Sequence, residues 1–560
     1  MGFFKSLTNL FSKTPAPIEP VEAIIVPTPV IVPKVKEVPV QRITEPTEGA
    51  PRAQVKTIPN HSHFNEFYSN HRQHQKEACV SLDTETIGQV IIPTGTGKTR
   101  IQVSTHINDM ISSPSGVYLI GAHRLMLCHQ LLDDLLSEAH QCGLSFDLLF
   151  VGSNRMDANK IYSKYQGLNK SNCQVKHTLS EKIVTKCAHS AKQNNRHLII
   201  VCTYHSFRKL FNIPVIEICT YDEAHTLTAP TFKANVSLIK PNIKKNFFFT
   251  ATPKNRGEDG GMKDFNFFGK PIYEMAPRTA IDAGEIVAPK LHIIKSVDGE
   301  TYTNQSMHIR VVQAGFDKHR EMVDERIGAK ILISTTGNKE MFEIIHDEEF
   351  QTWCKDKVRV IAFSSSQEAN QGYYVDFKSV SRQDAFDALK SLKDEEDALL
   401  FHIEILTEGI DLPSITGVMP FRSLESGKLF QTLGRASRLI KSDRTALYAG
   451  EMLPTETEKF IKPNSWLILP KDFKHLVNYA EMKKIMVDIL NEYEIPIDQL
   501  VIDNQYLADK SALLPRIPLS DSAKSRDKVC DITHIFEDII VDTVSNMTKD
   551  DLHNELLNLG

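Results

Sequence analysis

Short apolar runs alternate with longer amphipathic stretches from about residue 61 onward. In the first half of the chain the runs are Gly88–Ile92, Gly116–Ile120, Leu198–Cys202, Val215–Tyr221 and Asn246–Thr250. Each run has the length of a buried strand, and the stretches between them are long enough for helices. This alternation predicts a parallel β-sheet with helices packed on its faces, because parallel strands need crossover connections.

A second set of apolar runs begins near residue 287. These runs are Lys330–Ser334, Val358–Phe363, Leu399–Ile405, Gly417–Pro420 and Ser465–Leu469. Segments with helical periodicity such as 381–392 lie between them. The pattern predicts two α/β domains in tandem, at residues 61–280 and 281–470, with the join around residues 276–288.

The two ends of the chain have a different character. Residues 15–51 hold nine of the 27 prolines, a density that favours an extended tether. Residues 1–13 form either a short amphipathic helix that docks on a partner or a membrane surface, or a frayed terminus. Together residues 1–60 are expected to be an amphipathic N-terminus and a disordered tether. Residues 471–560 are expected to be a small helical extension, beginning with a helix at 473–490 and ending with one after Thr548.

Residues 151–196 interrupt the first domain with a polar stretch rich in Asn, Gln, Ser and Lys. Its lysines are spread evenly through the segment. Two interpretations remain open, a solvated surface excursion or a basic flap over nucleic acid.

Composition and charge narrow the class of protein. The chain is 41% hydrophobic and 24% charged, with a formal net charge of −5, as is typical of globular proteins. No stretch approaches the length needed to span a bilayer. The nine cysteines include no CxxC pair, which suits a reducing compartment and argues against a zinc ribbon. We expect a cytoplasmic protein, with the nucleus open if the cell is eukaryotic.

The segment 93–99, Pro-Thr-Gly-Thr-Gly-Lys-Thr, directly follows the first apolar run. Glycines let a backbone curl so that its N–H groups point at phosphate oxygens, and a following helix directs its positive end at them. The strict P-loop pattern has glycine where this chain has Ile92. We expect a phosphate-binding loop made by Thr94, Gly95, Thr96, Gly97, Lys98 and Thr99.

An acid pair, Asp222 and Glu223, ends another apolar run. Asp222 and the Thr99 hydroxyl would hold Mg²⁺, and Glu223 would orient and deprotonate the attacking water. Lys98 would supply positive charge near the β- and γ-phosphates. These residues predict hydrolysis of a nucleoside triphosphate, with ATP and Mg²⁺ as the bound species.

The order of the motifs resembles that of superfamily-two helicases of the DEAH type. After Gly-Thr-Gly-Lys-Thr come Asp-Glu-Ala-His at 222–225, Thr-Ala-Thr-Pro at 250–253, Thr-Glu-Gly-Ile-Asp-Leu-Pro at 407–413 and Gln-Thr-Leu-Gly-Arg-Ala-Ser-Arg at 431–438. The wording is most similar to the branch of DNA helicases that holds the motor subunits of type I and type III restriction enzymes. The resemblance covers about residues 75–440 and implies two tandem RecA-like domains.

The resemblance also implies roles for single residues. Arg72 and Gln75 would read adenine, Arg435 and Arg438 would be arginine fingers that reach the γ-phosphate, and Gln431 would sense the same cleft. Gly409 and Asp411 would line that cleft, while His225, Thr250 and Thr252 would couple it to the nucleic acid. The residues expected to touch the nucleic-acid backbone are Arg124, Thr203, Ser206, Thr335 and Thr407.

Three functions are compatible with these motifs. The favoured one is an ATP-dependent DNA helicase or translocase. A second is an ATP-driven motor subunit of a restriction or defence complex, whose partner would dock on the N-terminal tether or the C-terminal helices. A third is an RNA helicase, because Asp-Glu-Ala-His also occurs in RNA enzymes. No nuclease constellation accompanies the motor motifs.

Overall fold

The computed structural model describes residues 60–152, 158–170, 172–254, 260–294, 304–364, 372–403, 414–421 and 426–470, with residues 489 and 492–494. The tether expected before residue 60 lies outside the described residues. So does the C-terminal extension expected after residue 470, apart from residues 489 and 492–494.

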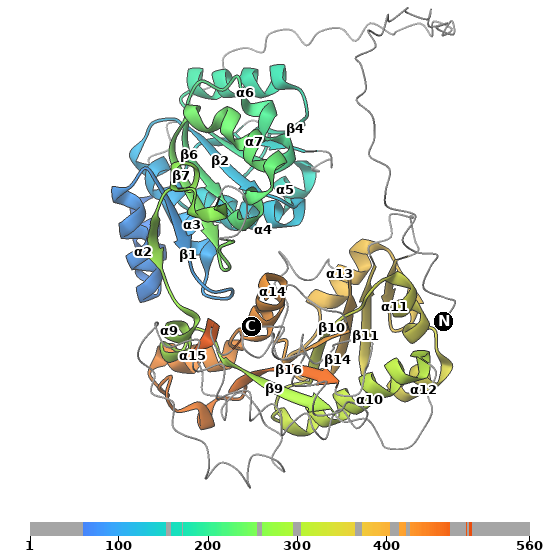
Figure 1. Ribbon diagram of the computed structural model, residues 1–560. Coiled ribbons are helices and arrows are strands. Elements are labelled where there is room, and N and C mark those ends of the chain that lie inside the picture. Colours follow the sequence, from blue (N-terminus) through green and yellow to red (C-terminus); the bar gives the residue numbers. More distant parts are fainter. Residues whose placement is uncertain are drawn as a thin grey trace, which may run out of the picture. The chain divides into compact units, whose positions relative to one another are not determined.

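The first sheet has eight strands in the order β4-β3-β5-β2-β6-β7-β1-β8, and every neighbouring pair is parallel (Figure 1). Its strands are β1 Ile87–Ile91, β2 Val117–Ala122, β3 Phe146–Val151, β4 Val175–Thr178, β5 His197–Thr203, β6 Ile216–Tyr221, β7 Ile243–Thr250 and β8 Pro271–Glu274. The carboxyl ends of β1, β2, β5, β6 and β7 carry the predicted motifs, so the parallel order brings those motifs to one edge.

Helices cover both faces of this first sheet. Successive side chains of β5 point to opposite faces: Ile199 packs in the core with Ile101 and Leu131, whereas Ile200 packs with Val184. The helices and 3₁₀ segments of this half are α1 His61–Ser69, α2 Gln73–Thr84, α3 Lys98–Ser112, α4 Leu125–Gln141, α5 Ala158–Lys164, α6 Glu181–Gln193, η1 Tyr204–Leu210, η2 Ala224–Thr228, α7 Pro230–Ile239, η3 Lys240–Asn242, η4 Gly261–Lys263 and α8 Phe265–Phe268. We call this sheet and its helices, residues 60–274, the first lobe.

The second sheet also has eight strands, in the order β13-β12-β11-β14-β10-β15-β16-β9. It is parallel from β11 to β9, and the edge strands β12 and β13 are antiparallel. Its strands are β9 Ala288–Ile294, β10 Lys330–Ser334, β11 Arg359–Phe363, β12 Tyr373–Val375, β13 Lys378–Ser379, β14 Ala398–His402, β15 Gly417–Pro420 and β16 Asn464–Pro470. We call this part, residues 277–470, the second lobe.

Helices also cover both faces of the second sheet. On β10, Ile331 and Ile333 pack with the core of α10 to α12, whereas Leu332 packs in the core that contains Leu433 of α14. The helices are α9 Pro277–Asp282, α10 Asn304–Met322, α11 Asn338–Ile345, α12 Glu348–Cys354, α13 Arg382–Lys390, α14 Ser426–Ala436 and α15 Lys441–Ala449. Among the described helices, none offers an apolar stretch of the length that a bilayer requires.

The prediction of two tandem RecA-like domains is confirmed by these two sheets. All ten predicted strands are present, and β10 and β15 have the predicted bounds. The structure adds β3, β4, β8, β9, β12 and β13, which the sequence analysis did not predict. All six additions lie at or next to a sheet edge.

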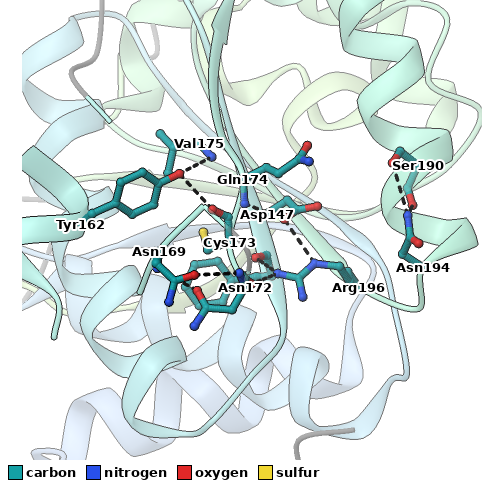
Figure 2. Close-up of polar contacts among 11 residues, drawn as sticks. Asp147, Tyr162, Asn169, Asn172, Cys173, Gln174, Val175, Ser190, Asn194 and Arg196 are labelled. Carbon is teal, nitrogen blue, oxygen red and sulfur yellow. Dashed lines mark hydrogen bonds and ion pairs between the residues drawn. The ribbon is translucent and has the colours of Figure 1, made fainter. Parts of the chain in front are cut away.

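The expectation of a solvated surface excursion at residues 151–196 is wrong for the described part of that segment. Strand β4 pairs with β3, and α6 buries Val184 and Cys187 against the sheet. Figure 2 shows how polar contacts tie the segment to β3: Asp147 Oδ1 accepts from Arg196 Nε at 3.2 Å and from the Gln174 N–H at 2.8 Å. The polar residues of the segment therefore satisfy backbone groups at a sheet edge, which is why its composition resembled that of a loop.

Candidate functional site: a cavity between a phosphate cradle and two arginines

The predicted phosphate loop lies between β1 and α3. Gly95 and Gly97 have φ angles of +93° and +90°, a region that favours glycine, and α3 begins at Lys98. A Cβ atom on Gly97 would collide with Gln75 Nε2 and crowd Arg72 Nη2, so a side chain there would displace the ends of both. The loop therefore curls tightly before the helix and directs the positive end of α3 at the space in front of it.

Side chains from the first turn of α2 support this loop from behind. Gln75 Nε2 donates to Thr96 O at 3.0 Å, while Gln75 Oε1 accepts from the Arg72 N–H at 3.0 Å. His74 Nε2 also lies 2.8 Å from Thr96 O. Gln75, predicted to read adenine, is only 1% exposed, and in the described residues its amide is held by the cradle. The structure thus places it behind the phosphate loop and leaves Arg72 on the cavity wall.

The loop faces a cavity of about 420 Å³. The first lobe contributes its phosphate loop, its acid pair and parts of α1, α3 and α4. The second lobe contributes three arginines. The wall includes Arg72, Thr94, Gly95, Gly97, Lys98, Thr99, Asp222, Glu223, Arg435, Arg438 and Arg444. Predicted residues from four separate sequence motifs are therefore brought to one space.

The acid pair follows β6 directly and is almost fully buried. Asp222 Oδ1 accepts from Gln102 Nε2 at 3.0 Å, and the backbone carbonyl of Asp222 accepts from the Tyr204 hydroxyl at 2.6 Å. Burial, reinforced by the nearby charge of Glu223, raises the pKa of Asp222 to about 7. Two carboxyl groups in so little solvent favour a cation between or beside them.

Glu223 has a strained backbone and an unsatisfied carboxylate oxygen. Its φ of +48° lies in the left-handed region, which costs a non-glycine residue roughly 1–3 kcal/mol. Glu223 Oε2 is buried and accepts no hydrogen bond within the described residues, although His225 Nδ1 lies 3.5 Å away. Glu223 also lines the cavity, and a carboxylate there is suited to bind a water molecule or take up its proton.

Lys98 lies between the phosphate loop and the acid pair. Its Nζ donates to Ile92 O at 3.3 Å. Burial lowers the pKa of Lys98, and the charges of Glu223 and Asp222 act in the opposite direction. An anion in the cavity would offer this ammonium group a further partner.

The two predicted arginine fingers come from the end of α14 in the second lobe. Arg435 is 5% exposed, and Arg438 packs so closely on the phosphate loop that a Cβ on Gly95 would lie 2.9 Å from Arg438 Cγ. Lys462, which the sequence analysis missed, fixes this segment: its Nζ donates to Ala436 O and, at 2.6 Å, to Arg438 O. Both guanidinium groups line the same cavity as Lys98.

The predicted coupling residues form one hydrogen-bonded group. His225 Nδ1 lies 3.0 Å from Thr250 Oγ1, and Gln431 Nε2 lies 3.1 Å from His225 Nε2. Gln431 Nε2 also approaches Thr252 Oγ1 at 3.5 Å. The group links the acid pair, the end of β7 and α14.

The residues predicted to touch nucleic acid differ in burial and in whether the structure describes them. Arg124 is half-buried at the start of α4, and Thr203 Oγ1 lies 3.5 Å from Ser206 Oγ beyond β5. Thr335 is 0% exposed and its hydroxyl donates to His402 O at 3.5 Å, so the structure does not present it at the surface. Thr407, Gly409 and Asp411 lie outside the described residues.

Comparison with known proteins finds one family that matches part of the chain. Residues 68–255 match the family described as "Type III restriction enzyme, res subunit". No curated protein matches the chain.

Several solved structures align with this chain at low sequence identity. The ATP-dependent type ISP restriction-modification enzyme LlaBIII bound to DNA is 15% identical, with a TM-score of 0.53 over 84% of this chain and 33% of that one. A nuclease-deletion mutant of the type ISP enzyme LlaGI with a DNA substrate mimic is 16% identical, with a TM-score of 0.49 over 85% and 32%. The Mycobacterium smegmatis helicase Lhr, bound to single-stranded DNA and AMP-PNP, is 14% identical, with a TM-score of 0.46 over 84% and 55%.

The chain spans about a third of the length of the two type ISP enzymes. At these identities the likeness concerns the fold. The family match confirms, for residues 68–255, the predicted resemblance to a type III restriction-enzyme subunit, and the tandem RecA-like fold agrees with it.

Proposed function

We propose that this chain is an ATP hydrolase that couples hydrolysis to movement along nucleic acid, with DNA as its track. The observation that carries the proposal is the single cavity lined by Lys98, the acid pair and two arginines of the other lobe. Arginine is always charged and forks onto phosphate oxygens, so its approach from a second lobe makes hydrolysis depend on how the lobes meet.

The side chains divide the chemistry among them. The N–H groups of the phosphate loop and Lys98 would bind the phosphates, and Glu223 would take the proton of the attacking water. Arg435 and Arg438 would stabilise the charge that develops on the transferred γ-phosphoryl group. His225 and Gln431 would relay the state of the cavity to the ends of β7 and α14.

Mg²⁺ fits the donors that the chain offers. The Thr99 hydroxyl and the Asp222 carboxylate are hard oxygen ligands, and both residues line the cavity. When bound, the ion neutralises charge on the β- and γ-phosphates.

DNA is favoured over RNA because the family match names a restriction enzyme subunit, and the type ISP relative is described as bound to DNA. An RNA helicase is the alternative, since both kinds of motor share the fold. A motor subunit of a restriction or defence complex is a further candidate, supported by the same family description.

The test is steady-state ATP hydrolysis measured with no polymer, single-stranded DNA, duplex DNA or RNA, with Lys98→Ala as the inactive control. Stimulation by DNA alone supports the proposal and justifies unwinding assays with tailed duplexes. Stimulation by RNA alone selects the RNA helicase. Hydrolysis that no polymer stimulates points to a missing partner, which pull-downs with residues 1–60 as bait would seek.

A further inference from the structure

One buried carboxylate joins the two lobes behind the phosphate loop. Glu285 follows α9 in the second lobe and is 7% exposed. It forms an ion pair with Arg72 Nη1, and its Oε1 lies 3.3 Å from His74 Nδ1. Both partners belong to the first lobe, at the start of α2.

His74 lies between the phosphate loop and Glu285. Its Nε2 lies 2.8 Å from the carbonyl oxygen of Thr96, and its Nδ1 lies 3.3 Å from Glu285 Oε1. Glu285 therefore faces both the Arg72 guanidinium and the His74 ring.

Glu285 is ionised in this setting. Burial raises the pKa of its carboxyl, but the hydrogen bond from His74 and the charge of Arg72 outweigh burial, and the pKa lies below its ordinary value. Tyr448 of α15 also interacts with Arg72, and the charge of Glu285 acts to raise the pKa of Tyr448. The carboxylate is thus held by the first lobe while its backbone belongs to the second.

The residues directly after Glu285 hold the arginine segment. Ile286 forms a β-bridge with Arg438, and the Val287 N–H donates to Ser437 O at 2.8 Å. A continuous path therefore runs from Thr96 in the phosphate loop through His74 and Glu285 to Arg438.

We propose that Glu285 is a positioning residue that sets the segment of Arg435 and Arg438 against the phosphate loop. The proposal rests on the function proposed above. Glu285 does not line the cavity within the described residues, so it acts through Arg72, His74 and the bridge to Arg438. Loss of its charge would remove the ion pair with Arg72 and weaken the contact with His74, which opposes closure of the two lobes.

The first test is Glu285→Gln in the full chain, which keeps the shape and removes the charge. We expect kcat for polymer-stimulated ATP hydrolysis to fall ~10-fold while the Kd for ATP changes less than ~3-fold, because only the arginine segment is displaced. Glu451→Gln, at an exposed acid of the same lobe, is the matched control and should keep full activity. A kcat for Glu285→Gln within ~2-fold of the unaltered chain overturns the proposal.

A double-mutant cycle guards against a general loss of folding. Arg72→Gln and Glu285→Gln should together lower kcat no further than the worse single variant, because both break one linkage. If the double variant lowers kcat by the product of the two single effects, the positioning role of Glu285 is wrong.

Hydrogen–deuterium exchange without nucleotide separates this proposal from the proposed function. Glu285→Gln should raise exchange at residues 286–287 and 437–438 together, with residues 93–97 and the strands of both sheets unchanged. If the unaltered chain hydrolyses no ATP, the proposed function fails, and exchange alone decides the role of Glu285. Unchanged exchange at both segments overturns it.

Discussion

Nε2 of Gln431 lies 3.1 Å from Nε2 of His225 and must donate to it, because an amide nitrogen cannot accept. The imidazole hydrogen of His225 is therefore on Nδ1, which donates to Thr250 Oγ1 at 3.0 Å. One tautomer thus connects the second lobe to the end of β7. The predicted coupling role would act through this hydrogen-bonded connection.

Replacement of the Gln431 amide donor by an acceptor should uncouple ATP hydrolysis from nucleic-acid binding. Gln431→Glu replaces the donor with an acceptor, so the contact to His225 Nε2 is lost unless the ring takes up a second proton. We expect the stimulation of ATP hydrolysis by DNA to fall ~10-fold with little change in the Kd for ATP. Gln166→Glu, at an exposed position, is the control. Full stimulation in Gln431→Glu would remove Gln431 from the coupling group.

Arg435→Ala should abolish hydrolysis and leave nucleotide binding largely intact. Its guanidinium lines the cavity from the second lobe, while the phosphate loop belongs to the first. Arginine fingers in related hydrolases contribute roughly 10³–10⁵ in rate. Turnover and the Kd for a fluorescent ATP analogue would be measured beside Arg326→Ala, an exposed arginine paired with Asp324. If Arg435→Ala hydrolyses ATP normally, the two-lobe site is wrong.

Two glycines with similar backbones offer a matched test of the cradle. Gly97 has φ +90° and a Cβ there would lie 2.2 Å from Gln75 Nε2, whereas Gly450 has φ +72° and nothing within 4 Å. Both alanine variants carry the same kind of backbone strain, roughly 1 kcal/mol. Only Gly97→Ala should also push Gln75 away and lose ATP binding, measured by titration calorimetry. Equal binding by both variants would contradict the supporting role of Gln75.

The alternation of apolar runs predicted the central strands of both sheets, because those strands are buried on both faces and read as continuous apolar segments. Strand β4 escaped prediction because Val175–Thr178 includes Lys176 and His177 and lies at a sheet edge. Its pairing partner is β3, which lies far from it in the sequence. Edge strands depend on such tertiary contacts more than on local pattern.

The residues of the candidate site also fall into those that the sequence predicted and those that it did not. Lys98, Asp222 and Arg435 lie in compact motifs, so their residue types and spacing predicted them. Glu285 and Lys462 escaped prediction because each acts on a residue that is far away in the chain. Gln102 could have been found, since it lies one helical turn after Lys98 and so shares its side of α3.

Tyr204 should prove to be a positioning residue for the acid pair. Its hydroxyl donates to Asp222 O at 2.6 Å, while the equally buried Tyr221 donates to Asn246 Oδ1 at 2.9 Å. Tyr204→Phe and Tyr221→Phe should each cost about 1–3 kcal/mol of unfolding free energy, because a buried acceptor loses its partner. Only Tyr204→Phe should lower kcat, by ~3–10-fold, at a temperature where both variants remain folded. Equal kcat values would assign Tyr204 to stability alone.

Lys462 should give the stability of the chain a distinct pH dependence. Burial lowers its pKa from 10.5 to about 7, against the charge of Asp443, which raises it; Arg438, Lys330 and Arg444 lower it further. Between about pH 7 and 10.5 the unfolded chain holds a proton at this lysine that the folded chain has released. The contribution of Lys462 to unfolding free energy therefore rises with pH in that window, by up to about 1.4 kcal/mol per pH unit, and is flat below it.

The measurement for Lys462 is urea denaturation of the unaltered chain and of Lys462→Met at pH 7 and pH 9. Methionine retains most of the buried volume and does not titrate, so ionisable groups distant from Lys462 contribute equally to both proteins. The difference in unfolding free energy should shift in favour of the unaltered chain as the pH rises. A difference that is the same at both pH values would mean that the lysine stays protonated in the folded chain, with Ala436 O and Arg438 O as charge-assisted acceptors. In that case the arginine segment would be held by a permanent cation.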